Sequence, residues 1–306
     1  MENNILPART WQTRLNGLLR LSRWKEHILF TVPLTLLGAN LAAGHHPDAV
    51  TLDWRLLAVT IANVLAVTLA FMVNDVEDAP DDAREAARAA RNPVTSGEIT
   101  RREGWLASIV VSGVALVCYA WTSEAAFWTG VITVALAYLY SWRTVRLKAL
   151  PVVDVISHIL MLSALLFLAG YFAYHDDPGR VWLVALAVGL VSVYGQLYNQ
   201  LRDYDMDRAA GLHNTASVLG PRLTQMLMYG SLIAALACLA ITIAWGLWPL
   251  WLVVVPVVTA PLLIFFRPST DMRGTEAIDV SGRVQLGFIL IANATVLVWL
   301  VAHLLD

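Results

Sequence analysis

Hydrophobic residues fall into long runs along the chain, separated by short polar segments. Such runs, each of about 18–25 residues as a membrane-crossing helix requires, lie at residues 27–44, 54–74, 104–122, 124–142, 150–174, 181–201, 223–245, 247–266 and 285–305. Backbone amides have no water to bond to inside a bilayer, so a helical bundle is the expected solution. The pattern predicts an all-α, polytopic membrane protein with nine transmembrane helices.

Composition supports this class, because 58% of the 306 residues are hydrophobic and 14% are charged. A soluble domain carries about 25% charged residues. No linker is long enough to separate soluble domains, so we expect one domain over residues 1–306. The distance between its two acidic segments suggests pseudo-equivalent halves at about 20–145 and 146–304.

The distribution of basic residues predicts the orientation. If the N-terminus and every second loop are cytoplasmic, that side holds all of the 21 Lys and Arg residues except Arg55 and Arg180. Cytoplasmic loops are enriched in Lys and Arg in this way. We therefore expect a protein of the cell inner membrane, with its C-terminus on the opposite side.

Acidic residues gather where the second and sixth runs end, in two loops of the cytoplasmic side. Asp75, Asp78 and Asp82 follow one run, and Asp203 and Asp207 follow the other. At spacings of three and four, such residues share a helix face and their like charges repel. A cation between them would relieve this repulsion, although acidic residues beyond a span are often simply solvated.

Oxygen ligands of this kind suit Mg²⁺, which uses one or two carboxylates and completes its shell with substrate phosphate. Two such faces could hold a diphosphate, with Lys148, Arg146 and Arg91 offsetting its charge. An apolar central cavity open to the cytoplasmic side would house an isoprenoid tail. Asp154 lies about one turn into the fifth run and either lines this site or pairs with a neighbouring helix.

Other polar residues within the runs are expected to bond between helices. They are Asn40, Asn63, Gln196 and Asn293.

Several motifs in order resemble the UbiA superfamily of membrane prenyltransferases, from about residue 20 to 304. Asn74-Asp75-x-x-Asp78-x-x-x-Asp82 is similar to its first aspartate motif, and Asp203-x-x-x-Asp207-Arg-Ala-Ala-Gly to its second. Arg91-Asn-Pro-Val-Thr-Ser-Gly97 and the segment from Tyr140 to Lys148 resemble the stretches between them. Pro80 departs from the pattern; since proline tends to break a helix, we expect Asp82 on a new turn and prefer the pair Asp75–Asp78.

The resemblance implies a site built from these motifs. Its metal ligands would be Asn74, Asp75, Asp78, Asp82, Asp203 and Asp207. Asn199 and Lys148 would contact the diphosphate, Arg91 is a further contact, and Tyr140 would lie near the bond that breaks.

The function expected is Mg²⁺-dependent transfer of a prenyl group from a prenyl diphosphate to a lipophilic acceptor, with an aromatic acceptor preferred. Alternatives within the superfamily are terpene cyclisation without an acceptor and phosphoribosyl transfer to polyprenyl phosphate. A membrane transporter is an alternative of another class, although transporters tend to bind solutes near the bilayer midplane. The expected partners include the lipid bilayer and no nucleic acid; the sequence leaves open the acceptor, the prenyl length and the oligomeric state.

Overall fold

A computed structural model describes residues 10–44, 53–209, 211–261 and 280–305, and these residues form helices and loops without a strand. The helices of the first half are α1 (Trp11–Leu21), α2 (Trp24–Gly44), α3 (Trp54–Asp82), α4 (Ala86–Arg91), α5 (Arg101–Ala120) and α6 (Glu124–Ser141). Those of the second half are α7 (Val153–Ile159), α8 (Leu165–Phe172), α9 (Trp182–Arg202), α10 (Tyr204–Ala209), α11 (Thr215–Leu219), α12 (Pro221–Ala244), α13 (Val254–Thr259) and α15 (Val280–Leu305). Short 3₁₀ turns lie at Leu147–Ala149, Gly179–Val181 and Leu250–Val253.

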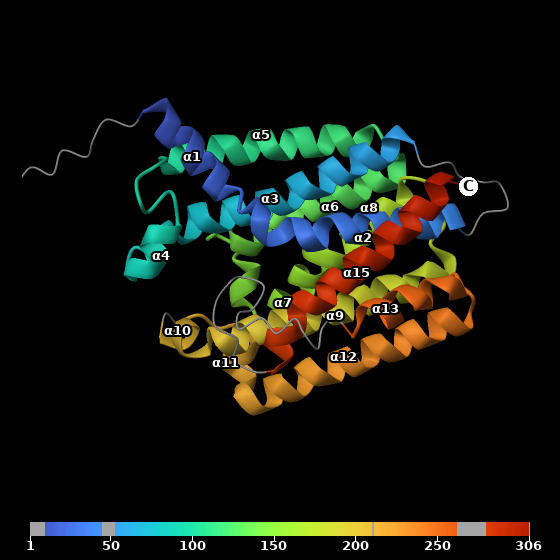
Figure 1. Ribbon diagram of the computed structural model, residues 1–306. Helices are drawn as coiled ribbons and strands as arrows, with labels where there is room; N and C mark the ends of the chain where they lie inside the picture. The colour runs from blue at the N-terminus through green and yellow to red at the C-terminus, as the bar shows by residue number, and fades with distance from the viewer. Residues whose placement is uncertain (1–9, 45–52, 210, 262–279, 306) are drawn as a thin grey trace, which may run out of the picture.

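The long helices run side by side as one bundle (Figure 1). Seven helical segments in the described residues are long and apolar enough to cross a membrane. They match seven of the nine predicted spans, as expected of an integral membrane protein.

The other two predicted spans differ from these seven. The run at 124–142 forms α6, an 18-residue helix that packs beside α3, α5 and α8. The run at 247–266 is helical over Leu250–Thr259, a short apolar segment, and its residues 262–266 lie outside the described part of the chain. The count of nine therefore stays a prediction.

A π-helical turn at Leu160–Ala164 joins α7 to α8, so one span holds a local irregularity. Close backbone approach then fixes α8 against α2. A Cβ atom on Gly38 would lie 2.1 Å from the Phe167 carbonyl oxygen, and one on Gly170 would lie 2.2 Å from that of Thr35. Small residues allow membrane helices to approach in this way.

Buried amides tie the spans together, as the sequence predicts. Asn63 donates to Thr35 Oγ1 at 2.7 Å and to the Leu166 carbonyl at 2.9 Å, so it links α3 to α2 and α8. Asn40 and Asn293 each donate to a backbone carbonyl across the α2–α15 contact. Such bonds satisfy polar groups that water does not reach.

One end of this bundle collects both acidic segments, and we call it the aspartate end. The C-terminal turns of α3 and α9 reach it, and α4, α10 and α11 lie across it (Figure 1).

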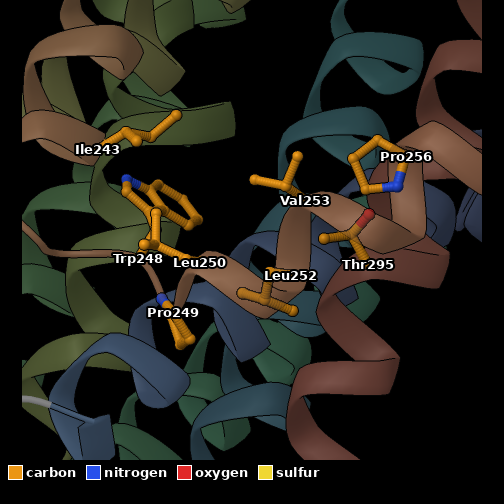
Figure 2. A pocket seen from close by; sticks show the side chains of 8 residues that line it. All are labelled: Ile243, Trp248, Pro249, Leu250, Leu252, Val253, Pro256 and Thr295. Atoms are coloured by element: carbon orange, nitrogen blue, oxygen red, sulfur yellow. The ribbon is translucent and has the colours of Figure 1, made fainter.

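An apolar cavity of about 140 Å³ lies elsewhere, between the end of α12, the segment 248–256 and α15 (Figure 2). Ile243, which lines it, is 22 residues beyond the start of α12, or about 33 Å at 1.5 Å per residue. It is therefore distinct from the predicted central cavity, which remains a prediction.

Candidate active site

The two aspartate motifs lie in one region of the aspartate end. Arg88 of α4 lies 3.7 Å from the Met206 sulfur of α10, so the segment after the first motif contacts the second motif. Lys148, which binds the first motif, also acts electrostatically on Asp207 of the second. Residues 125 positions apart, Asp78 and Asp203, thus belong to one polar region.

Asp78 of the first motif lies beside two cations from the segment after α6. Lys148 Nζ lies 2.5 Å from Asp78 Oδ2 and 3.0 Å from Asn74 Oδ1. Arg146 Nη2 lies 3.6 Å from Asp78 Oδ1, and Ser141 Oγ donates to Asn74 Oδ1 at 3.0 Å. The structure thus brings together four residues that the sequence predicted: Asn74, Asp78, Arg146 and Lys148.

The first motif stays helical to its last residue. α3 continues through Pro80 to Asp82, and the Ala83 amide bonds to the Ala79 carbonyl at 3.1 Å. Our expectation that Asp82 begins a new turn was therefore wrong. Pro80 removes one amide donor, and the helix ends two residues later, so the loss does not break the helix face.

Asn92 anchors the loop that follows this motif. Its side-chain amide donates to Asp82 Oδ2 at 2.8 Å and to the Asp75 carbonyl at 2.7 Å. Its own oxygen accepts from the amide of Val94 at 2.9 Å. Asn92 therefore fixes this loop to α3.

Asp75 belongs to a separate ion-pair chain. Arg23 Nη1 donates to Asp75 Oδ1 at 3.2 Å, and Arg23 Nη2 to Glu26 Oε2 at 2.6 Å. Arg91 binds both oxygens of Glu26 at 2.8 Å. The Arg91 side chain therefore binds Glu26 at the start of α2, and Glu26 in turn binds Arg23.

The loop after α6 is held on α3 by contacts that our sequence analysis missed. Arg143 donates to the Glu77 carbonyl at 2.9 Å and to Asp81 Oδ2 at 2.8 Å, and Arg146 donates to the same Asp81 oxygen at 3.2 Å. Glu77 and Asp81 are four residues apart, so they share one helix face. This i,i+4 spacing of Glu77 and Asp81 is visible in the sequence, but it does not indicate which basic residues contact them.

The aspartates of the second motif contact residues that are near them in the chain. Asp203 caps α9 and pairs with its neighbour Arg202 at 3.0 Å. Asn214 donates to Asp207 Oδ2 at 2.8 Å. Burial raises the pKa of Asp207 to about 6 and the Asp203 charge adds to this rise, although Arg88, Asn214 and Lys148 act against it. Asn199 is half-buried one turn before Asp203.

Two further predicted residues, Tyr140 and Asp154, contact α9. Tyr140 accepts a hydrogen bond from Gln196 Nε2 at 3.1 Å, so it bridges α6 and α9. Asp154 is fully buried and accepts from Gln200 Nε2 at 2.7 Å and from the Thr215 amide at 2.8 Å. These contacts match pairing with neighbouring helices, which was one of our two interpretations of Asp154.

The donor set is compatible with Mg²⁺. Carboxylate and amide oxygens are the ligands that this ion accepts. In the described part of the chain, buried Asp78 Oδ1 accepts no hydrogen bond, so it retains lone pairs for a ligand. Among the described residues, no group of three or more carboxylate, His or Cys side chains is close enough together to hold a metal ion.

Comparison with known proteins gives the class. A family model described as the UbiA prenyltransferase family matches residues 31–279. A 4-hydroxybenzoate octaprenyltransferase of Acidovorax ebreus is 33% identical over 256 residues, which cover 79% of this chain and 81% of that protein. A digeranylgeranylglyceryl phosphate synthase of Methanoregula boonei is 24% identical over 234 residues, covering 75% and 79%.

Solved structures agree on the fold. A UbiA homologue from Archaeoglobus fulgidus bound to GPP and Mg²⁺ is 22% identical, with a TM-score of 0.71 over 95% of this chain and all of that one. The same homologue bound to DMAPP and Mg²⁺ gives a TM-score of 0.69, with 21% identity over 94% and 99%.

The chain therefore belongs to the UbiA prenyltransferase family. It is a UbiA-type prenyltransferase, which confirms the resemblance seen in its motifs and sets the transporter alternative aside.

Proposed function

We propose that this protein transfers a prenyl group from a prenyl diphosphate to a lipophilic, aromatic acceptor, using Mg²⁺ held by both aspartate motifs. The main support is the meeting of the two motifs around Lys148 at one end of a UbiA-type bundle. A relative named 4-hydroxybenzoate octaprenyltransferase supports an aromatic acceptor, and structural neighbours bound to GPP or DMAPP with Mg²⁺ support the donor and the ion.

The metal ligands in this proposal are Asn74, Asp75, Asp78, Asp82, Asp203 and Asp207. Mg²⁺ supplies, when bound, a Lewis acid that neutralises charge on the departing diphosphate. Lys148 and Arg146 lie against Asp78, so they are placed to add two positive charges beside the diphosphate. We place Asn199 at the diphosphate as well, while Arg91 acts from outside, through Glu26 and Arg23.

Breaking the allylic carbon–oxygen bond leaves a carbocation on the prenyl group and both bonding electrons on the diphosphate. The acceptor carbon attacks that cation and then loses a proton. The protein must exclude water until attack occurs. Tyr140, which accepts a hydrogen bond from Gln196 of α9, would border the reacting carbon.

The proposal also includes an orientation. Nineteen of the 21 basic residues favour a cytoplasmic aspartate end and N-terminus, with the C-terminus opposite. One domain of nine spans in the cell inner membrane, with a central cavity opening to the cytoplasm, is consistent with this arrangement.

Diphosphate release by the purified protein in nanodiscs tests the function. The reaction is run with prenyl diphosphates of several lengths, with or without Mg²⁺ and with or without aromatic acceptors, and Asp78→Asn is the inactive control. Release that requires both Mg²⁺ and an aromatic acceptor, with a prenylated product in the mass spectrum, is the expected result. Mg²⁺-dependent release that yields a cyclised hydrocarbon without acceptor would replace transfer by cyclisation.

A further inference from the structure

The first helix presents three different faces. α1 has 11 residues, about 16 Å, which is too short to cross a bilayer. At 100° per residue, Gly17 and Leu21 lie on one face, Trp11, Leu15 and Leu19 on a second, and Gln12 and Asn16 on a third. Each face meets a different environment in the structure.

The first face is docked on the protein. Gly17 and Leu21 are buried, and a Cβ atom on Gly17 would lie 2.7 Å from Ile99 Cγ2. Arg20 pairs with Glu98 and donates to the carbonyls of Ala90 and Arg91 at 2.6 and 3.0 Å. These contacts hold α1 across the aspartate end, at an angle to the spans (Figure 1).

The second face, formed by Trp11, Leu15 and Leu19, is apolar and exposed, and we call it the stripe. Trp11 is 70% exposed, Leu19 54% and Leu15 45%. Apolar residues are also exposed near the starts of neighbouring spans, such as Trp24 in α2 and Leu106 in α5. Because the Arg14–Glu103 ion pair joins α1 to the first turn of α5, the stripe lies where that span enters the bilayer.

The charged residues near the stripe favour an anionic membrane surface. Lys25 and Arg102 are exposed at the starts of α2 and α5, while Glu98 and Glu103 are each paired with an arginine of α1. Basic side chains beside apolar ones are typical of helices that lie in a membrane interface with anionic lipid.

We propose that α1 is an interfacial helix whose stripe of Trp11, Leu15 and Leu19 inserts among anionic phospholipids of the leaflet at the aspartate end. Its polar third face, with Gln12 and Asn16, points to water. Arg20 of α1 also binds the backbone of the loop 90–99, and Asn92 of that loop binds Asp82. These contacts connect the lipid-binding helix to the first aspartate motif.

Spin labels on two neighbouring residues test the insertion. In a background with Cys118→Ala and Cys238→Ala, a nitroxide is attached at Leu15→Cys or at the matched control Asn16→Cys, with the full protein in liposomes. Oxygen should broaden the label at 15 preferentially, and a water-soluble nickel chelate the label at 16. Two labels equally open to nickel would overturn the proposal, and a label at 15 shielded from both reagents would assign the stripe to a protein partner.

Lipid charge is tested on the unlabelled protein by hydrogen exchange of the α1 amides. Replacing phosphatidylglycerol by phosphatidylcholine should lower their protection by about tenfold, as should Trp11→Ser with Leu15→Ser, because apolar burial is lost. Gln12→Ser with Asn16→Ser is the control that should change little. Protection independent of lipid charge would overturn the anionic specificity, and protection unchanged by removing the stripe would overturn insertion.

Discussion

Each aspartate motif contains a pair of aspartates at i,i+4 spacing, Asp78 with Asp82 and Asp203 with Asp207, but the surroundings of the two motifs differ. Around the first motif, Asp75, Asp78, Asp81 and Asp82 each contact an Arg, Lys or Asn side chain from another segment. Around the second, Asp203 pairs with its own neighbour Arg202, and Asp207 binds an asparagine. The cations beside the first motif thus come from other segments of the chain, whereas Asp203 pairs with the arginine next to it in sequence.

This difference suggests separate tasks. Carboxylates that are already paired with Lys148 and Arg146 sit in a prearranged position beside the diphosphate, as catalysis by electrostatic stabilisation requires. Carboxylates that repel each other, with the pKa of Asp207 raised to about 6, gain more from a divalent cation. We therefore expect mutations in either motif to lower activity to a similar extent. Mutations in the first motif should lower stability more than mutations in the second.

The largest effect is expected from Asp78→Asn and Asp203→Asn, each of which should lower turnover at least about 100-fold because charge stabilisation is lost. Asp78→Asn also removes the carboxylate charge beside Lys148 and Arg146, so it should cost about 1–3 kcal/mol of unfolding free energy. Asp203→Asn should cost less than about 1 kcal/mol. Diphosphate release and thermal unfolding measure the two quantities, and equal stability losses would remove the contrast between the motifs.

Lys148→Met should raise the KM for the prenyl diphosphate about 10- to 100-fold, since a charge-assisted contact is worth about 1.5–3 kcal/mol. Arg202→Met is the matched control, because its guanidinium pairs locally with Asp203, and its effect on KM should stay within a few-fold. Steady-state kinetics with varied donor measures both. A similar rise in both variants would mean that total charge, and not the position of Lys148, controls donor binding.

Asp154→Asn should act on stability more than on the reaction. The new amide group would face the donors Gln200 Nε2, the Thr215 amide and Thr215 Oγ1, so about 1–3 kcal/mol of unfolding free energy should be lost. At a temperature where the variant stays folded, KM for the donor should change by no more than a few-fold. A KM increase as large as that of Lys148→Met would return Asp154 to the diphosphate site.

The smallest effect concerns pH. The pKa of Asp207 is raised in the folded state to about 6, from an ordinary value near 3.8. The folded protein thus binds the extra proton between these values, and this contribution to stability is lost as pH rises through about 6. Asp207→Asn lacks this loss. Its unfolding free energy relative to wild type should therefore increase from pH 5 to pH 8, by an amount on the order of 1 kcal/mol after screening. Thermal unfolding in EDTA at both pH values measures it, and a gap that shrinks would contradict the assignment.

The sequence was sufficient for features that depend on local periodicity. Apolar runs such as 54–74 and 181–201 predicted the helices α3 and α9, because a hydrocarbon environment leaves the backbone few alternatives. The i,i+4 spacing of Asp203 and Asp207 is likewise visible in the chain, and the Asp207 amide does bond to the Asp203 carbonyl. The motifs in their order were also enough to indicate the family.

Tertiary structure decided the partners of each charge. Nothing local in the sequence pairs Arg23 with Asp75, Arg143 with Asp81 or Asn92 with Asp82, since each contact joins segments that meet only when the helices pack. The same holds for Asp154, whose burial against Gln200 and Thr215 follows from where α7, α9 and α11 meet. Periodicity is a property of one segment, whereas charge compensation depends on distances between segments, and the packed bundle sets those distances.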